Sequence, residues 1–117
     1  MNLNQIHNVY FVGIGGIGMS ALARYFHSIG KIVYGYDKTQ TDLTKELEKL
    51  GMSIHYTDDL GNIPSDVTKD NTLVVITPAV PKSHLEWNYF IDNGFEIKKR
   101  SEVLGLITKD TYCFAVA

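Results

Sequence analysis

The chain has 117 residues, of which 44% are hydrophobic and 21% charged, and its formal net charge is −2. This length and composition predict a single folded domain with its own core, and they argue against a disordered chain or a second full domain. A charge so close to neutral gives no general attraction to nucleic acid, so we expect no nucleic-acid partner.

The first predicted element is a buried strand that ends in a glycine-rich turn. Val9–Val12 are β-branched or aromatic, as is typical of a strand covered on both faces. Gly13, Gly15 and Gly18 follow at G-x-G-x-x-G spacing, and an apolar stripe at helical intervals then runs to Gly30. In the dinucleotide fingerprint these glycines permit a tight turn, a close approach of backbone N–H groups to a diphosphate, and close packing of helix on strand. We therefore expect an anion at the helix N-terminus, and the alternative is that the glycines serve packing alone.

A second strand is predicted over residues 31–36, and Asp37 stands at its carboxyl end. This position is about 20 residues after the last glycine of the turn, where the fingerprint places an acidic residue. The carboxylate of Asp37 is suited to accept hydrogen bonds from ribose hydroxyls or from a base N–H. The alternative is a solvated loop acid without a ligand.

The middle of the chain predicts a helix, a short strand and a helical turn. Thr41 is a candidate N-cap, and Gly51 is placed to end the helix that follows. Alternation over residues 52–56 indicates a third strand, and a short helical turn is expected around residues 60–63. The apolar face of the helix would consist of Leu43, Leu47 and Leu50.

The last third of the chain predicts two strands and two helices. The fourth strand, residues 72–77, is broken by Pro78 where ligands gather, and the hydroxyl of Thr77 is expected to face the glycine turn. A helix over residues 83–93 and a strand over 95–98 follow. The final helix would be capped by Ser101 and run to Thr108.

Arg100 is the best candidate for a side-chain contact with substrate, because a guanidinium presents paired donors to phosphate or carboxylate oxygens. A structural ion pair is the alternative. The four histidines lack metal-ligand spacing, so we assign no metal, and no residue is assigned a catalytic role. Neither a phosphate-loop motif nor an apolar run long enough to span a membrane occurs, so we expect a cytoplasmic protein without a membrane partner.

Alternating strands and helices with a glycine-rich first crossover predict an α/β fold. We expect one Rossmann-like, doubly wound domain with a mostly parallel five-stranded sheet. The ligand crevice would lie beside the first strand.

Several motifs resemble those of one ligase family over the whole chain. The run Gly13–Ser20, Gly-Ile-Gly-Gly-Ile-Gly-Met-Ser, resembles the N-terminal signature of the UDP-N-acetylmuramate–L-alanine ligases of peptidoglycan synthesis. Gly35-Tyr-Asp37, Thr77-Pro-Ala-Val80 and Arg100-Ser-Glu-Val-Leu104 are similar to further motifs of that family. Phe114–Ala117 resembles the strand that runs into its ATP-binding loop.

The resemblance implies that residues 1–110 bind the UDP part of UDP-N-acetylmuramate, and that 111–117 begin a missing ATP-binding central domain. ATP and Mg²⁺ would form an acyl phosphate for attack by L-alanine in the parent enzyme. The fragment itself would hold no cofactor and be inactive. An NAD-binding oxidoreductase, a regulatory domain and a related UDP-muramoyl-peptide ligase remain alternatives. The implied substrate-binding residues are Gly13, Gly15, Gly16, Ile17, Gly18, Met19, Ser20, Asp37, Thr77, Pro78, Ala79 and Arg100.

Overall fold

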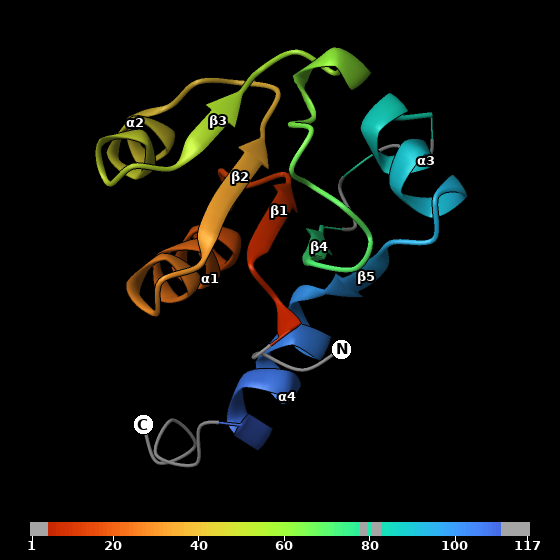
Figure 1. Cartoon of the computed structure of the whole chain (residues 1–117). Coiled ribbons are helices and arrows are strands. Elements are labelled where there is room, and N and C mark those ends of the chain that lie inside the picture. The colour runs from red at the N-terminus through yellow and green to blue at the C-terminus, as the bar shows by residue number, and fades with distance from the viewer. Residues whose placement is uncertain (1–4, 78–79, 81–82, 111–117) are drawn as a thin grey trace.

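The computed structural model describes residues 5–77, 80 and 83–110. They form a five-stranded parallel sheet with helices on both faces and strand order β3-β2-β1-β4-β5 (Figure 1). The predicted doubly wound α/β fold is confirmed, and the sheet is parallel throughout. The strands are β1 (Asn8–Val12), β2 (Ile32–Tyr36), β3 (Ser53–His55), β4 (Thr72–Ile76) and β5 (Glu96–Lys99). The helices are α1 (Ile17–Ser28), α2 (Asp42–Lys49), α3 (Leu85–Asp92) and α4 (Arg100–Asp110), with a 3-10 turn η2 (Leu60–Asn62).

The central strand β1 divides the core into two layers, because successive side chains point to opposite faces of a sheet. Val9 and Phe11 pack in one layer with residues of α1, α2 and α4. Tyr10 and Val12 pack in the other with α3. All five residues of β1 are buried, which places the glycine turn at the centre of the sheet's carboxyl edge.

Helix α2 begins with a capping box. The side chain of Thr41 accepts a hydrogen bond from the backbone N–H of Thr44 at 3.2 Å, and the Thr44 hydroxyl accepts the N–H of Thr41 at 2.8 Å. These bonds satisfy two donors that a helix start would otherwise leave without a partner. The predicted N-cap is confirmed.

Replacing Thr41 with alanine should therefore lower the free energy of unfolding by about 1 kcal/mol, the usual cost of losing a threonine cap. Urea denaturation followed by circular dichroism measures this change. Lys45→Ala, an exposed change in the same helix, is the matched control and should shift stability by less than about 0.5 kcal/mol. Equal effects of the two substitutions would contradict a capping role.

The buried face of α2 differs from the predicted one, and the buried face of α3 contains a charged residue. In α2 the buried residues are Thr44 and Leu47, whereas Leu50 lies beyond the helix end and is 46% exposed. In α3 the buried residues are Glu86 and Phe90, one turn apart. Because α3 is short, only one of its faces packs on the sheet, and that face includes the glutamate Glu86.

The start of the last helix also differs. Helix α4 begins at Arg100, so Ser101 lies inside its first turn and is not the cap. Glu102 instead accepts a hydrogen bond from the backbone N–H of Lys99 at 2.9 Å. No helix in the described part of the chain is long and apolar enough to cross a membrane. Residues 111–117, for which we expected a further strand, lie outside the described residues.

Candidate functional site

The glycine turn after β1 is held against β2 by backbone hydrogen bonds. The N–H groups of Gly13 and Ile14 both donate to the carbonyl of Tyr36, at 2.8 and 3.0 Å. Gly13 has a φ of 93°, the left-handed region that favours glycine. A side chain there would also meet the methyl group of Thr77. The methyl group of Thr77 thus faces the turn.

Gly15 lies close to Asp37. Its backbone N–H donates to the Asp37 carboxylate at 2.7 Å, and a Cβ at Gly15 would stand 2.5 Å from the same oxygen. The backbone of Gly15 is not left-handed, unlike that of Gly13, so its φ is open to residues with a Cβ. What requires a glycine at position 15 is the close approach of the carboxylate. Asp37 therefore shapes the turn and is more than a solvated loop acid.

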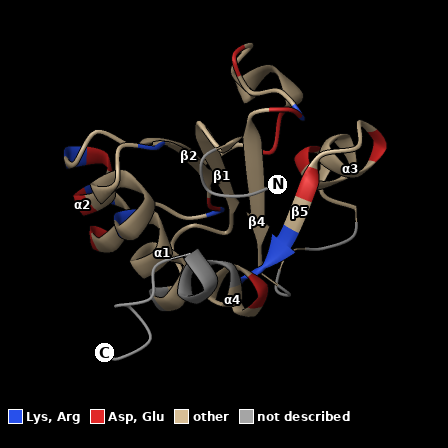
Figure 2. Cartoon of the chain, turned by 60° about the horizontal axis from the view of Figure 1, so that its bottom comes forward, with Lys and Arg blue, Asp and Glu red and all other residues tan. Residues whose placement is uncertain are grey.

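The first turn of α1 faces a cation. Gly16 is the N-cap and offers no side-chain hydrogen bond to the first N–H groups of the helix. A Cβ at Gly18 would meet the Cδ of Arg100 at 2.7 Å and its Nε at 2.8 Å, so the guanidinium lies over this turn. Figure 2 shows basic residues gathered where β5 runs into α4. The side chain of Arg100 has no ion pair or hydrogen bond with another described residue.

A helix N-terminus carries a partial positive charge, so a second positive charge beside it is unfavourable unless an anion lies between them. Arg100 and the start of α1 thus form a positively charged region at the first turn of the helix. The third glycine of the fingerprint, expected to bring the helix close to the strand, admits the arginine side chain.

A pocket of about 300 Å³ opens beside this positively charged region, at the carboxyl edge of the sheet. It combines the glycine turn with residues that follow β2 and β4, and with the N-cap of α3. Its lining residues are Gly13, Gly16, Tyr36, Asp37, Lys38, Thr77, Val80 and His84.

The other predicted site residues fall into three groups. Met19 and Ser20 are each 4% exposed, and the side chain of Met19 packs in the core. Pro78 and Ala79 lie outside the described residues. Ile17 begins α1, and its side chain is outside the described part.

His84 was not singled out from the sequence as a site residue. It is the N-cap of α3, and its Nδ1 accepts the backbone N–H of Trp87 at 3.3 Å. The carboxylate of Asp58 lies 3.2 Å from the same nitrogen and also accepts the N–H groups of Leu85 and Glu86. The sequence did contain one indication of this role. His84 stands just before the apolar run of α3, which is where an N-cap residue is expected.

The rings of Tyr36 and His84 pack edge to face, with centroids 4.5 Å apart. Burial raises the pKa of Tyr36 above its usual range, and the charges of Asp58, Glu86 and Asp37 raise it further. The Tyr36 hydroxyl therefore stays protonated, and the pocket wall formed by the two rings carries no charge from tyrosine.

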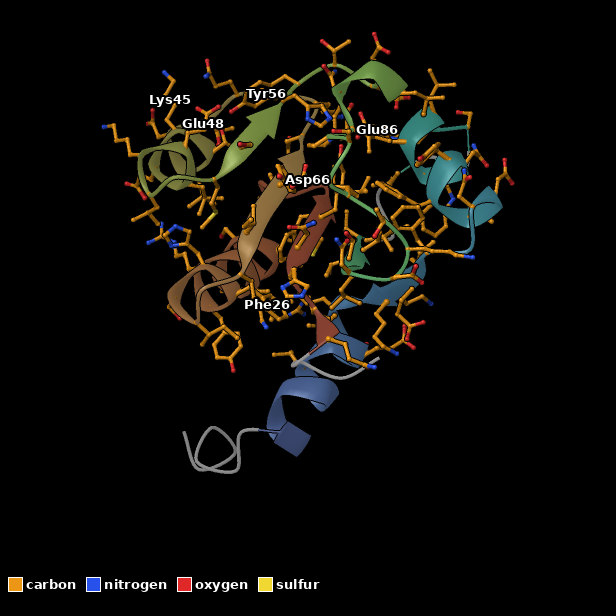
Figure 3. All side chains as sticks on the ribbon, viewed as in Figure 1. Phe26, Lys45, Glu48, Tyr56, Asp66 and Glu86 are labelled. Carbon is orange, nitrogen blue, oxygen red and sulfur yellow. The ribbon has the colours of Figure 1, made fainter. Side chains whose placement is uncertain are left out.

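A buried carboxylate anchors α3 to the sheet. Glu86 is fully buried and accepts hydrogen bonds from the hydroxyl of Tyr10 on β1 and from the backbone N–H of Asp59. The ring Nε2 of His55 on β3 lies 2.8 Å from the same carboxylate. Figure 3 shows Glu86 between α3 and the sheet. The network fixes the start of α3, and with it His84.

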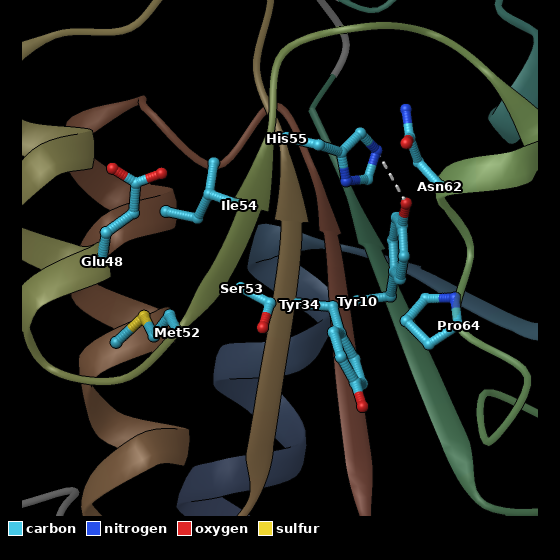
Figure 4. Close-up of a pocket in the computed structure, with 9 residues that line it drawn as sticks. All are labelled: Tyr10, Tyr34, Glu48, Met52, Ser53, Ile54, His55, Asn62 and Pro64. Carbon is cyan, nitrogen blue, oxygen red and sulfur yellow. Dashed lines mark hydrogen bonds between the residues drawn. The ribbon is translucent and has the colours of Figure 1, made fainter.

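A second pocket, of about 430 Å³, lies at the β3 edge of the sheet, and its lining extends from Tyr10 and Tyr34 to Glu48 of α2. Figure 4 shows the hydroxyl of Tyr10 directed at the ring of His55 on the wall of this pocket. The Tyr10 hydroxyl oxygen lies 3.1 Å from the Nε2 of His55. None of the predicted site residues lines this pocket. No group of three or more histidine, cysteine, aspartate or glutamate side chains in the described ranges is placed to hold a metal ion.

Comparison with known proteins gives a family match. The family described as "Mur ligase family, catalytic domain" matches residues 8–112. A UDP-N-acetylmuramate--L-alanine ligase of Flavobacterium psychrophilum is 68% identical over all 117 residues, and one of Flavobacterium johnsoniae is 66% identical. The chain spans about a quarter, 26%, of the length of each of these relatives.

Solved structures are also similar. The crystal structure of the UDP-N-acetylmuramate-alanine ligase MurC from Thermotoga maritima matches with a TM-score of 0.73 and 36% identity, covering 83% of this chain and 21% of that one. A UDP-N-acetylmuramate:L-alanyl-gamma-D-glutamyl-meso-diaminopimelate ligase from Neisseria meningitides gives a TM-score of 0.75 at 18% identity, covering 91% and 31%. The second match concerns the fold alone.

Proposed function

Because the chain belongs to the Mur ligase family, we propose that it binds the UDP part of UDP-N-acetylmuramate within an enzyme that ligates L-alanine. The observation that carries this proposal is the convergence of the Arg100 guanidinium with the uncapped first turn of α1. A diphosphate placed there would neutralise the cation and accept hydrogen bonds from the free N–H groups of the helix. The high identity to L-alanine ligases favours this substrate over a muramoyl peptide.

In this proposal the chain positions the substrate and other parts of the enzyme carry out the reaction. The sequence has no phosphate-loop lysine, and its described residues offer no carboxylate cluster for Mg²⁺. They therefore do not fit ATP with its metal, and we assign ATP, Mg²⁺ and L-alanine to the remainder of the parent enzyme. The 117 residues alone are expected to show no ligase activity. The proposed location of the parent enzyme is the cytoplasm.

The test is a titration of the chain with UDP-N-acetylmuramate, UDP and NAD, followed by amide NMR shifts. We expect saturating shifts in the glycine turn and α1 with both uridine nucleotides, at dissociation constants of roughly 10 μM to 1 mM. Shifts with NAD and none with the uridine nucleotides would replace this proposal with a dinucleotide-binding function.

Arg100→Ala should weaken UDP binding at least about tenfold, because a charge-assisted hydrogen bond contributes about 1.5–3 kcal/mol. Isothermal titration calorimetry measures the change. Arg24→Ala is the matched control: Arg24 is also on the surface, pairs with Glu46 at 3.0 Å, and does not line the pocket. The same loss in both variants would indicate a general charge effect and would contradict a contact by Arg100.

A further inference from the structure

A third pocket, of about 400 Å³, lies where the ends of β4 and β5 meet α3 and α4. Its walls include Ile76 of β4, Ile97 of β5 and the indole ring of Trp87 from α3. Lys99, the last residue of β5, also lines it. The proposed site for the UDP part leaves this cavity, which we name the Trp87 pocket, without an assigned ligand.

The Trp87 pocket adjoins the pocket of about 300 Å³ that contains Asp37. Thr77 and Val80 line both cavities, so their side chains form a shared wall. Lys99 directly precedes Arg100, whose guanidinium lies over the first turn of α1. A diphosphate held at that turn would therefore lie near both pockets.

The strand order indicates which end of a ligand enters which pocket. From β1 the chain proceeds to β2 and β3 on one side and then crosses to β4 and β5 on the other, so the order reverses between β1 and β4. In doubly wound folds a ligand with a diphosphate lies across this point, and its nucleoside meets the acidic residue after the second strand. That residue is Asp37. The group on the second phosphate is then directed toward the ends of β4 and β5, which is where the Trp87 pocket lies.

We propose that the Trp87 pocket binds the sugar carried by the second phosphate, and that the indole of Trp87 packs on the C–H face of the pyranose ring. This inference rests on the proposed UDP site. An indole offers a broad, rigid apolar surface, and Ile76 and Ile97 enclose the same space. The residue is half-buried, and its backbone N–H donates to the Nδ1 of His84 at 3.3 Å, which fixes it at the start of α3.

Lys99 supplies the polar contact that a sugar requires. Its side chain is exposed and has no ion pair or hydrogen bond with another described residue. An ammonium group carries three donors, which suit the hydroxyl, acetamido and carboxylate oxygens of the sugar. An apolar wall opposite a donor group matches the two kinds of surface that a pyranose presents.

The fluorescence of the wild-type chain tests this proposal directly, because Trp87 is its only tryptophan. Saturation with UDP-N-acetylmuramate should shift the emission to shorter wavelength, since a ring packed on the indole removes water from it. Saturation with UDP, which has no sugar beyond the diphosphate, should leave the emission unchanged.

Calorimetry on variants gives the energetic counterpart. Trp87→Ala should lower the affinity for UDP-N-acetylmuramate about tenfold and leave that for UDP within about twofold. Trp87→Phe keeps a smaller ring and should lose only about threefold. Ile91→Ala is the matched control: Ile91 lies on the same helix, is 47% exposed and does not line the pocket, so both affinities should stay within about twofold.

Three results would overturn the sugar site. They are an equal emission shift with UDP, an emission unmoved by UDP-N-acetylmuramate that binds by calorimetry, and equal losses of both ligands, or of neither, in Trp87→Ala. Failure of the wild type to bind either nucleotide is a different outcome, because it contradicts the proposed UDP site itself.

Discussion

Replacing Gly13 with alanine should lower the free energy of unfolding by about 2–5 kcal/mol. Its φ of 93° costs about 1–2 kcal/mol for a residue with a Cβ, and overpacking against Thr77 adds about 1–3 kcal/mol. Urea denaturation measures the loss. Because domains of this size are stable by only about 5–15 kcal/mol, the variant is expected to lie close to unfolding.

Gly16→Ala is the matched control. Gly16 lies in the same turn with a φ of −70°, and a Cβ there would have its nearest contact at 3.8 Å, on the side chain of Met19. We expect a change of less than about 1 kcal/mol. If both alanine variants lose the same stability, the turn is sensitive to any added methyl group and the backbone argument for Gly13 is wrong.

Glu86→Ala should cost about 3–5 kcal/mol, because it leaves the donors around a fully buried carboxylate without an acceptor. Burial raises the pKa of the Tyr10 hydroxyl well above its usual range, so in the variant this hydroxyl stays a donor without an acceptor. Chemical denaturation of the variant and the wild type gives the difference.

Two further variants separate burial from charge. Glu86→Gln keeps an acceptor of the same shape and should lose clearly less stability than the alanine variant. Glu46→Ala removes a glutamate whose side chain is 62% exposed and should change stability by less than about 1 kcal/mol. A Glu86→Ala variant as stable as Glu46→Ala would show that the buried network contributes nothing to the fold.

The sequence predicted those elements whose signals are local. The strand, turn and helix from Asn8 to Ser28 follow from an apolar run, a glycine spacing and a helical period, all within about twenty residues. The cap at Thr41 is equally local. The candidate site was also partly predictable, because parallel strands bring the residues after β1, β2 and β4 to one edge.

The buried polar network was not predictable in the same way. A glutamate in a short helix is normally solvated, and Glu86 is buried because Tyr10 and His55 reach it from 76 and 31 positions away in the chain. The hydrogen bond from the N–H of Gly15 to the Asp37 carboxylate likewise joins two loops. Nothing in the sequence of either loop indicates that the other is its partner. Such pairings depend on strand order and register, which no local pattern contains.

The strand order also determines when this chain can complete its fold. One edge of β1 pairs with β2, but the other pairs with β4, where Asn8 lies opposite Thr72, 64 positions later. During synthesis the first strand therefore emerges with one apolar edge open until β4 has been translated. Contacts of such long range slow folding, and an unpaired strand edge promotes association between nascent chains. Translation speed over residues 37–76 thus sets how long the central strand of the sheet remains exposed.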